Sequence, residues 1–226
     1  MFLSLLFNSP AIAIVWIVVI FLSITVHEFA HAYMANRKGD PTAAQAGRLT
    51  LNPIAHIDPI GLIPLLLLGF GWAKPVPFNP YNLKDPKKDA VHIALAGPFA
   101  NLLLAVAAAL ALRGLASAGM LASSSLLPVF LVLLVIINLF LLFFNIIPVH
   151  PLDGSKLVDA LLVKPQHQKL RNAIATYGPQ ALLILVLISI IAPAFNVFFF
   201  VSWPAYALCN GLVGENCLLL LSLIFG

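Results

Sequence analysis

Charged residues are scarce in this sequence. Only 9% of its 226 residues are Asp, Glu, Lys or Arg, whereas 62% are hydrophobic and the mean hydropathy is +1.03. Soluble domains carry about 25% charged residues, so this chain has too few to cover a surface that faces water. The composition therefore excludes an ordinary soluble domain and predicts an integral membrane protein.

Basic residues and cysteines are also few. The 12 Lys and Arg against 8 Asp and Glu give a formal charge of +4, which is too small and too scattered for a nucleic-acid-binding surface. Cys209 and Cys217 show neither a CxxC spacing nor a disulfide framework, so we expect both to serve as packing residues. Nucleic acid is therefore not an expected partner.

Long polar blocks are missing too, which argues against an appended soluble domain. The apolar N-terminus lacks the basic segment and the small-residue cleavage site of a cleaved signal peptide. We therefore expect one membrane-embedded domain over residues 1–226, with core motifs within 27–154 and C-terminal helices within 178–226.

Apolar runs dominate what is present. A helix needs about 20 apolar residues to cross the hydrocarbon core of a bilayer, and residues 10–34, 90–112 and 126–147 provide that length. Residues 178–226 are apolar but interrupted by Pro and Gly, and we expect further spans there. The predicted fold class is an all-α polytopic membrane protein with about five to six transmembrane helices.

The segment between the first two spans has a different pattern. Residues 47–52, GRLTLN, alternate as in a β-strand. Residues 60–72 are apolar but too short to cross, and glycines interrupt them, which suggests a partially inserted hairpin. We expect a small membrane-associated strand and re-entrant region here.

Lys and Arg gather in two loops, residues 36–89 and the polar stretch from 148 to about 177. Two spans separate these loops, so both lie on the same side of the membrane. The positive-inside rule makes that side cytoplasmic and leaves the N-terminus outside. We expect a multi-pass protein of the cell (inner or plasma) membrane.

Buried polar residues on the first span require an explanation. Residues 26–32 read VHEFAHA and contain HExxH as His27, Glu28 and His31. The i, i+4 spacing places both imidazoles on one helix face, where they can bind Zn2+, and Glu28 can act as a general base. With two Glu and six His in the chain, chance would give this motif in about one shuffled sequence in a thousand. Such residues are costly within lipid, so a metal is their natural partner.

A catalytic zinc usually has three protein ligands, so a third ligand should lie at the same depth. Asp153 fits, because it follows the cytoplasmic end of the third span and HExxH lies in the last third of the first span, near the same face. Asp-Gly pairs are also common in turns. Taken alone, the pair Asp153 and Gly154 therefore favours a turn over a metal ligand.

Three motifs of this sequence resemble those of the site-2 protease family of intramembrane metalloproteases, peptidase family M50. HEFAH matches the family's HExxH, and residues 145–154, NIIPVHPLDG, match its NxxPxxxLDG. Residues 97–105, GPFANLLLA, are similar to its helix motif with glycine and asparagine. The resemblance covers residues 27–154, and the peptide-binding or nucleotide-sensing domains of some relatives have no counterpart.

This resemblance implies a zinc-dependent endopeptidase, with one Zn2+ per chain, that cleaves transmembrane or membrane-associated proteins in regulated intramembrane proteolysis. It implies metal ligation by His27, His31 and Asp153. Glu28 would be general base and acid, and Asn145 would lie near the reacting carbonyl and help to stabilise its oxyanion. The GRLTLN segment is similar to the family's strand for an unwound substrate.

Two alternatives remain open on the sequence. Buried His and Asp also mark ion pathways, so a membrane metal transporter or metal sensor is the main alternative, and a non-catalytic scaffold is the second. Among the other polar residues, we expect His56 to be an interfacial loop residue and His150 to lie at most in the outer shell of the metal. Gly97 and Asn101 could act at the site, but we favour a role in close helix packing.

Overall fold

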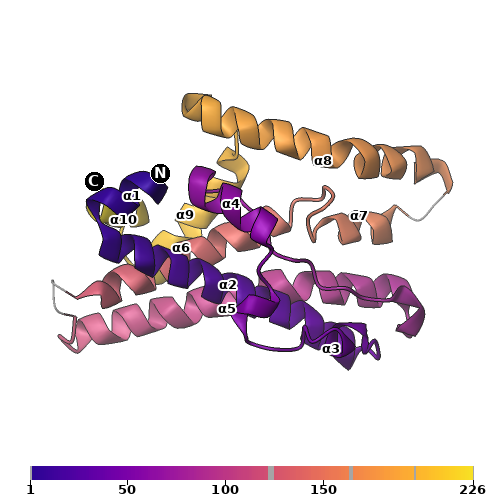
Figure 1. Ribbon diagram of the computed structural model, residues 1–226, viewed down its shortest axis with the longest axis horizontal. Coiled ribbons are helices and arrows are strands. Elements are labelled where there is room, and N and C mark those ends of the chain that lie inside the picture. Colours follow the sequence, from indigo (N-terminus) through magenta and orange to yellow (C-terminus); the bar gives the residue numbers. More distant parts are fainter. Residues whose placement is uncertain (1, 122–124, 163–164, 196, 226) are drawn as a thin grey trace.

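The chain folds into helices, as a computed structural model shows (Figure 1). The structure describes residues 2–121, 125–162, 165–195 and 197–225. Its α-helices follow in order: α1 Phe2–Asn8, α2 Pro10–Arg37, α3 Thr42–Gln45, α4 Pro59–Leu68, α5 Pro86–Ser117, α6 Leu126–Asn145, α7 Ser155–Leu161, α8 Gln168–Ile191, α9 Phe199–Val213 and α10 Cys217–Phe225. The predicted all-α fold class is confirmed.

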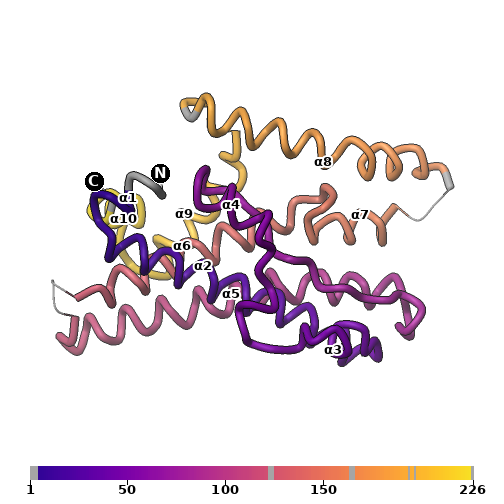
Figure 2. The backbone as a smooth tube through the Cα atoms, viewed as in Figure 1, coloured from indigo at the N-terminus to yellow at the C-terminus, as the bar shows by residue number. Residues whose placement is uncertain are grey.

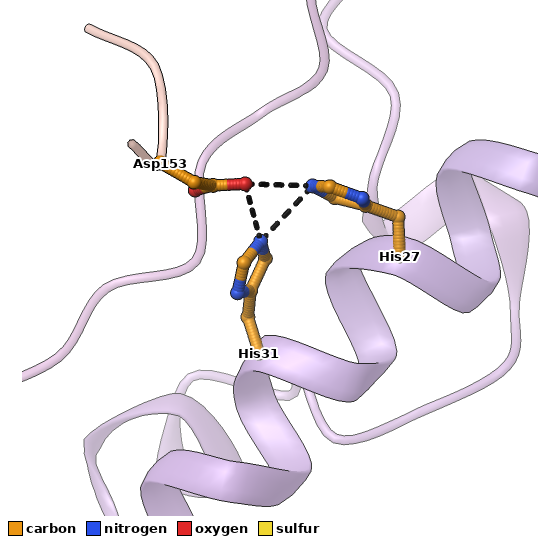
Figure 3. Close-up of side chains that lie close together, drawn as sticks. All are labelled: His27, His31 and Asp153. Carbon is orange, nitrogen blue, oxygen red and sulfur yellow. Dashed lines mark hydrogen bonds and ion pairs between the residues drawn. The ribbon is translucent and has the colours of Figure 1, made fainter. Parts of the chain in front are cut away.

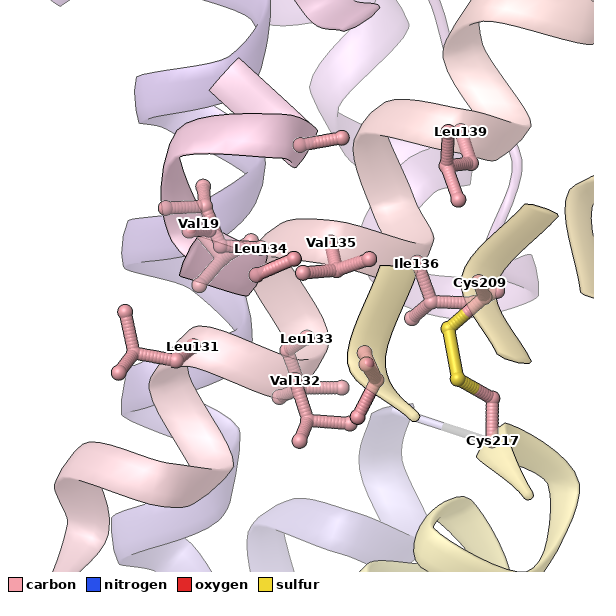
Figure 4. Packing of buried hydrophobic residues seen from close by; sticks show 14 of the residues in the cluster. Val19, Leu131, Val132, Leu133, Leu134, Val135, Ile136, Leu139, Cys209 and Cys217 are labelled. Atoms are coloured by element: carbon pink, nitrogen blue, oxygen red, sulfur yellow. A yellow bond between two sulfur atoms is a disulfide. The ribbon is translucent and has the colours of Figure 1, made fainter. Parts of the chain in front are cut away.

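Helices α2, α5 and α6 pack on one another and form the centre of the protein (Figure 1). Three alanines of α5 are buried in this core, Ala105, Ala108 and Ala109, and their small side chains let neighbouring helices approach closely. Residues 131–136 of α6 are all buried (Figure 4). Helix α6 is therefore apolar around its whole circumference because protein surrounds it at this level.

Among the described residues, four helices are long and apolar enough to cross a membrane, α2, α5, α6 and α8, and the bent pair α9 and α10 would make a fifth span. A multi-pass membrane protein is thus confirmed, at the lower end of the predicted number of spans. Helix α8 begins at Gln168, inside the stretch expected to be a polar loop, because its first turns are polar and only the rest is apolar. Within its most apolar window 17% of residues are buried, against 39–44% for α2, α5 and α6, so α8 lies at the periphery.

The short apolar segment after the first span turns back on itself, as expected of a re-entrant hairpin. Helix α4 ends at Leu68 and is capped by Gly69, whose positive φ of 77° favours glycine. The returning chain forms an antiparallel bridge between Ile57 and Ala73. The N–H of Lys74 donates to the carbonyl of His56 at 2.9 Å, and this closes the base of the hairpin (Figure 2).

The strand expected at residues 47–52 is not formed in the part of the chain that the structure describes. Instead, the buried Arg48 guanidinium donates to the carbonyl oxygens of Lys74 and Pro75. A side chain therefore holds this segment against the hairpin base. The alternation in GRLTLN did not predict burial either, because the polar Arg48 is buried and the apolar Leu51 is 62% exposed.

The two cysteines form a disulfide between α9 and α10 (Figure 4). The expectation that they serve only as packing residues was therefore wrong, although both are fully buried in the apolar core. A separation of eight residues between two cysteines does not by itself predict a disulfide. The bend of 93° between the two helices brings them together, and only the tertiary structure reveals that bend.

Candidate metal centre

His27 and His31 lie one turn apart on α2, with exposures of 6% and 7%. Residues four apart share a helix face, and the two Nε2 atoms lie 3.0 Å from each other. The outer ring nitrogens face other helices. His27 Nδ1 is 2.5 Å from Asn101 Oδ1, and His31 Nδ1 is 2.7 Å from the carbonyl oxygen of Ile93.

Asp153 completes a triangle with these two histidines (Figure 3). Its Oδ2 lies 3.2 Å from His27 Nε2 and 3.2 Å from His31 Nε2. One ligand atom from each of the three residues lies within 4.8 Å of the others. The structure thus brings together the three residues that the sequence predicts as metal ligands, although 122 positions separate His31 from Asp153.

Gly154 explains why the loop after α6 can present Asp153 in this way. Its N–H donates to the carbonyl of Asn145 at 2.7 Å, which folds the loop back on the end of α6. A Cβ at position 154 would overlap the carbonyl oxygen of Ile146. The φ of Gly154 is −58°, so close approach of two backbones requires this glycine, and a left-handed turn does not.

The donor set fits a divalent cation. The carbonyl of Ile93 can only accept a hydrogen bond, so a neutral His31 carries its proton on Nδ1 and turns the lone pair of Nε2 toward Asp153. The buried Oδ2 of Asp153 has no hydrogen-bond partner among the described residues. Two imidazoles and a carboxylate are a ligand set of catalytic zinc sites.

Glu28 lies on α2 beside His27 and is 9% exposed. Burial lowers the pKa of the Arg48 guanidinium, and the negative charge of the Glu28 carboxylate opposes that shift. The Asn145 amide donates to the carbonyl of Leu141 in its own helix at 2.9 Å. The roles of Glu28 as base and of Asn145 at the oxyanion therefore stay predictions.

The remaining histidines lie outside the ligand cluster found among the described residues. His56 was expected at an interface, but it is fully buried, and its Nε2 lies 2.8 Å from the carbonyl oxygen of Thr50. It organises the loop over α2. His150 pairs with Asp159 at 3.6 Å, which keeps it with α7 rather than with the imidazole pair.

Gly97 and Asn101 were expected to serve helix packing, and the structure places both against the site. A Cβ at Gly97 would overlap His31 Nε2 and lie 2.7 Å from His27 Nε2. Asn101 contacts His27 directly. The sequence motif contains both Gly97 and Asn101, but only the packing of α5 on α2 shows that these residues face the two imidazoles.

Comparison with known proteins places this arrangement in a family. The profile of peptidase family M50 matches residues 114–189. The Bacillus subtilis protein named "Putative zinc metalloprotease YwhC" is 38% identical over 191 residues, which cover 83% of this chain and 84% of the relative. The chain belongs to peptidase family M50. No solved structure gives a significant match.

Two mycobacterial proteins are similar to this chain as well. "Putative zinc metalloprotease Rip2" of Mycolicibacterium smegmatis is 30% identical over 185 residues, covering 79% of this chain and 67% of the relative. Its namesake in Mycobacterium tuberculosis is 31% identical over 192 residues, with the same coverage. The resemblance to site-2 proteases and the prediction of a metalloprotease are thereby confirmed. The matched segment 114–189 contains Asp153, whereas the HExxH helix lies outside it.

Gly97→Ala should weaken zinc binding by at least about tenfold. This is the lower end of the loss of affinity that follows when the surroundings of a metal ligand are disturbed. The added methyl group would take the space of the His31 ring and push the imidazole pair away from Asp153. Gly114→Ala on the same helix is the matched control, because apart from the backbone of α5 no described atom lies within 4 Å of its added Cβ. Zinc affinity of the purified variants, measured by competition with a chelator, checks this prediction. Equal affinities in both variants would contradict the close approach of α5.

Proposed function

We propose that this M50 peptidase is an intramembrane zinc endopeptidase, which hydrolyses peptide bonds of transmembrane or membrane-associated proteins. In this proposal His27, His31 and Asp153 hold one Zn2+ per chain. The observation that carries it is that His27 Nε2, His31 Nε2 and Asp153 Oδ2, each able to donate an electron pair to a metal, meet where α2 packs on α5 and faces the loop after α6. Buried groups of this kind persist within a bilayer when a partner satisfies them.

Zinc bound there would supply an acidified water and a polarised substrate carbonyl. Glu28 follows the first ligand directly, so it is offset by about 100° around α2 from His27 and reaches the reacting atoms from beside the imidazole pair. Its carboxylate takes the proton from the attacking water and delivers it to the leaving amine. Asn145, at the end of α6, orients the substrate carbonyl in this scheme. Glu28 thus moves protons, and the other residues position the reacting groups.

The surroundings of the site favour a substrate that lies in the same bilayer. The ligands sit on or beside spans whose outward faces are apolar, with Ile14, Val18 and Leu103 among the exposed side chains. A helical substrate hides its peptide carbonyls, so it must unwind locally before cleavage. Helix-breaking residues near the scissile bond should therefore favour cleavage, as expected of regulated intramembrane proteolysis.

Two independent features support an active site toward the cytoplasm of the cell membrane. The loops rich in Lys and Arg lie at the end of the bundle that carries α3 and α7 (Figure 1), which the positive-inside rule places in the cytoplasm. At the opposite end, the Arg113 side chain donates to the carbonyl of Leu212 at 3.4 Å, close to the disulfide of Cys209 and Cys217. Disulfides persist in oxidising compartments, which supports an external location for that end.

Removal of zinc should abolish cleavage reversibly. We would reconstitute the protein in vesicles with single-span peptides that contain a Gly-Pro pair near one end, and follow fragments by mass spectrometry. Cleavage should stop after treatment with a strong zinc chelator and return on addition of Zn2+, because Glu28 has no acidified water to deprotonate without the metal. A zinc-sensitive dye inside the vesicles tests the alternative of a transporter. Zinc flux without any zinc-dependent fragments would overturn the proposed function.

A further inference from the structure

A chain of buried polar side chains runs from His27 through the core of the protein. Asn101 Nδ2 donates to Asn138 Oδ1 at 2.6 Å, and Asn138 Nδ2 donates to Ser23 Oγ at 2.8 Å. Asn101, Asn138 and Ser23 come from α5, α6 and α2, and all three are fully buried. We call the two amide side chains of Asn101 and Asn138 the amide relay. It links the first metal-ligand candidate to both of the neighbouring spans.

Backbone carbonyls decide which way each amide of the relay faces. Asn138 Nδ2 lies 2.7 Å from the carbonyl oxygen of Leu134, which can only accept, so the nitrogen of Asn138 must face it. Asn138 therefore turns its oxygen to Asn101. Asn101 must then present its nitrogen to Asn138, and a second acceptor, the carbonyl of Ser23, lies 3.4 Å from that same nitrogen.

The orientation of the Asn101 amide also sets the hydrogen bond to the metal site. With its nitrogen committed to Asn138, Asn101 offers only its oxygen to His27 Nδ1, at 2.5 Å. An amide oxygen accepts and cannot donate, so Nδ1 of His27 carries the proton. The lone pair of the ring then lies on Nε2, which faces His31 and Asp153.

We propose that the amide relay is a positioning device, which fixes the tautomer and the ring orientation of His27 for metal binding. This inference rests on the proposed zinc site. His31 needs no relay, because a backbone carbonyl fixes its tautomer directly. Outer partners of this kind hold a metal-binding histidine in place, and their loss typically weakens metal binding by about 10- to 100-fold.

Polar residues within a span must find partners in any case, so simple helix packing is the competing role for Asn101. Two substitutions of similar size separate the roles. Asn101→Leu removes the acceptor for His27, whereas Asn101→Asp keeps an acceptor and adds a charge. Positioning predicts that the Leu variant binds zinc about 10- to 100-fold more weakly than wild type, and that the Asp variant binds more tightly than the Leu variant. Packing predicts the reverse order.

A second pair of variants acts at a distance from His27. Asn138→Leu frees the Asn101 amide to turn over and should weaken zinc binding, although residue 138 does not contact the histidine. Ser23→Ala is the control: it removes one acceptor of Asn138 but leaves Leu134, which sets the amide orientation, so zinc affinity should stay near that of wild type. Thermal unfolding of the metal-free proteins shows which variants are folded.

Zinc affinity by chelator competition, with the protein in detergent, is the readout for all four variants, and it requires no substrate. Tight binding by Asn101→Leu, or an equal loss in Asn138→Leu and Ser23→Ala, would overturn the relay while leaving the zinc site intact. A wild-type protein that binds no zinc would instead remove the proposed function itself. If Asn101→Leu does not fold, the comparison of Asn138→Leu with Ser23→Ala decides.

Discussion

Glu28→Gln should reduce peptide cleavage by about 10²- to 10⁴-fold, the usual contribution of a positioned general base, while the zinc content stays close to that of wild type. Gln has nearly the shape of Glu but cannot take a proton from water. The three predicted ligands do not include residue 28, so the metal should remain bound. Fragment yield and metal content, measured on one preparation of each protein, check both halves of the prediction.

Retained cleavage in Glu28→Gln would remove Glu28 from the proposed chemistry. Loss of zinc in that variant would show instead that residue 28 supports the metal site. Glu215 provides a matched control, because it is the other glutamate of the chain and lies in the turn between α9 and α10. Glu215→Gln should leave both cleavage and zinc content unchanged.

Asp153→Ala should weaken zinc binding strongly, because it removes a direct ligand. The loss of affinity should exceed the factor of about 10 to 100 that follows the loss of an outer-shell partner. The carboxylate is also the only negative charge within 3.2 Å of both imidazoles in the part of the chain described. Two imidazoles alone bind zinc poorly at a site built for three protein ligands. Zinc affinity by chelator competition measures the change.

Asp159→Ala is the control for Asp153→Ala. Asp159 lies six residues further along, on α7, where it pairs with His150 and Lys156 at the surface. Its loss removes a carboxylate of the same region without touching His27 or His31. If both variants keep one zinc per chain with unchanged affinity, Asp153 is no ligand, and the two histidines need another partner.

The membrane spans were the most predictable part of the fold. Lipid imposes a minimum length and an apolar composition on each span, so α2, α5 and α6 follow the predicted residues 10–34, 90–112 and 126–147 to within a few positions. Helix α8 was harder to place because its first turns are polar. The C-terminal bend and its disulfide gave no signal, since contacts between α9, α10 and α6 bring Cys209 and Cys217 together.

The sequence by itself determined the membrane environment and the local half of the candidate site. Because so few of its residues are charged, the chain needs lipid around it. A spacing of four residues puts His27 and His31 on one helix face whatever the rest of the chain does. Tertiary structure alone decided whether Asp153 reaches them, because that depends on how the loop after α6 folds back at Gly154. It also decided that Gly97 and Asn101 face the imidazoles. Contacts between helices distant in sequence depend on packing, which no local pattern encodes.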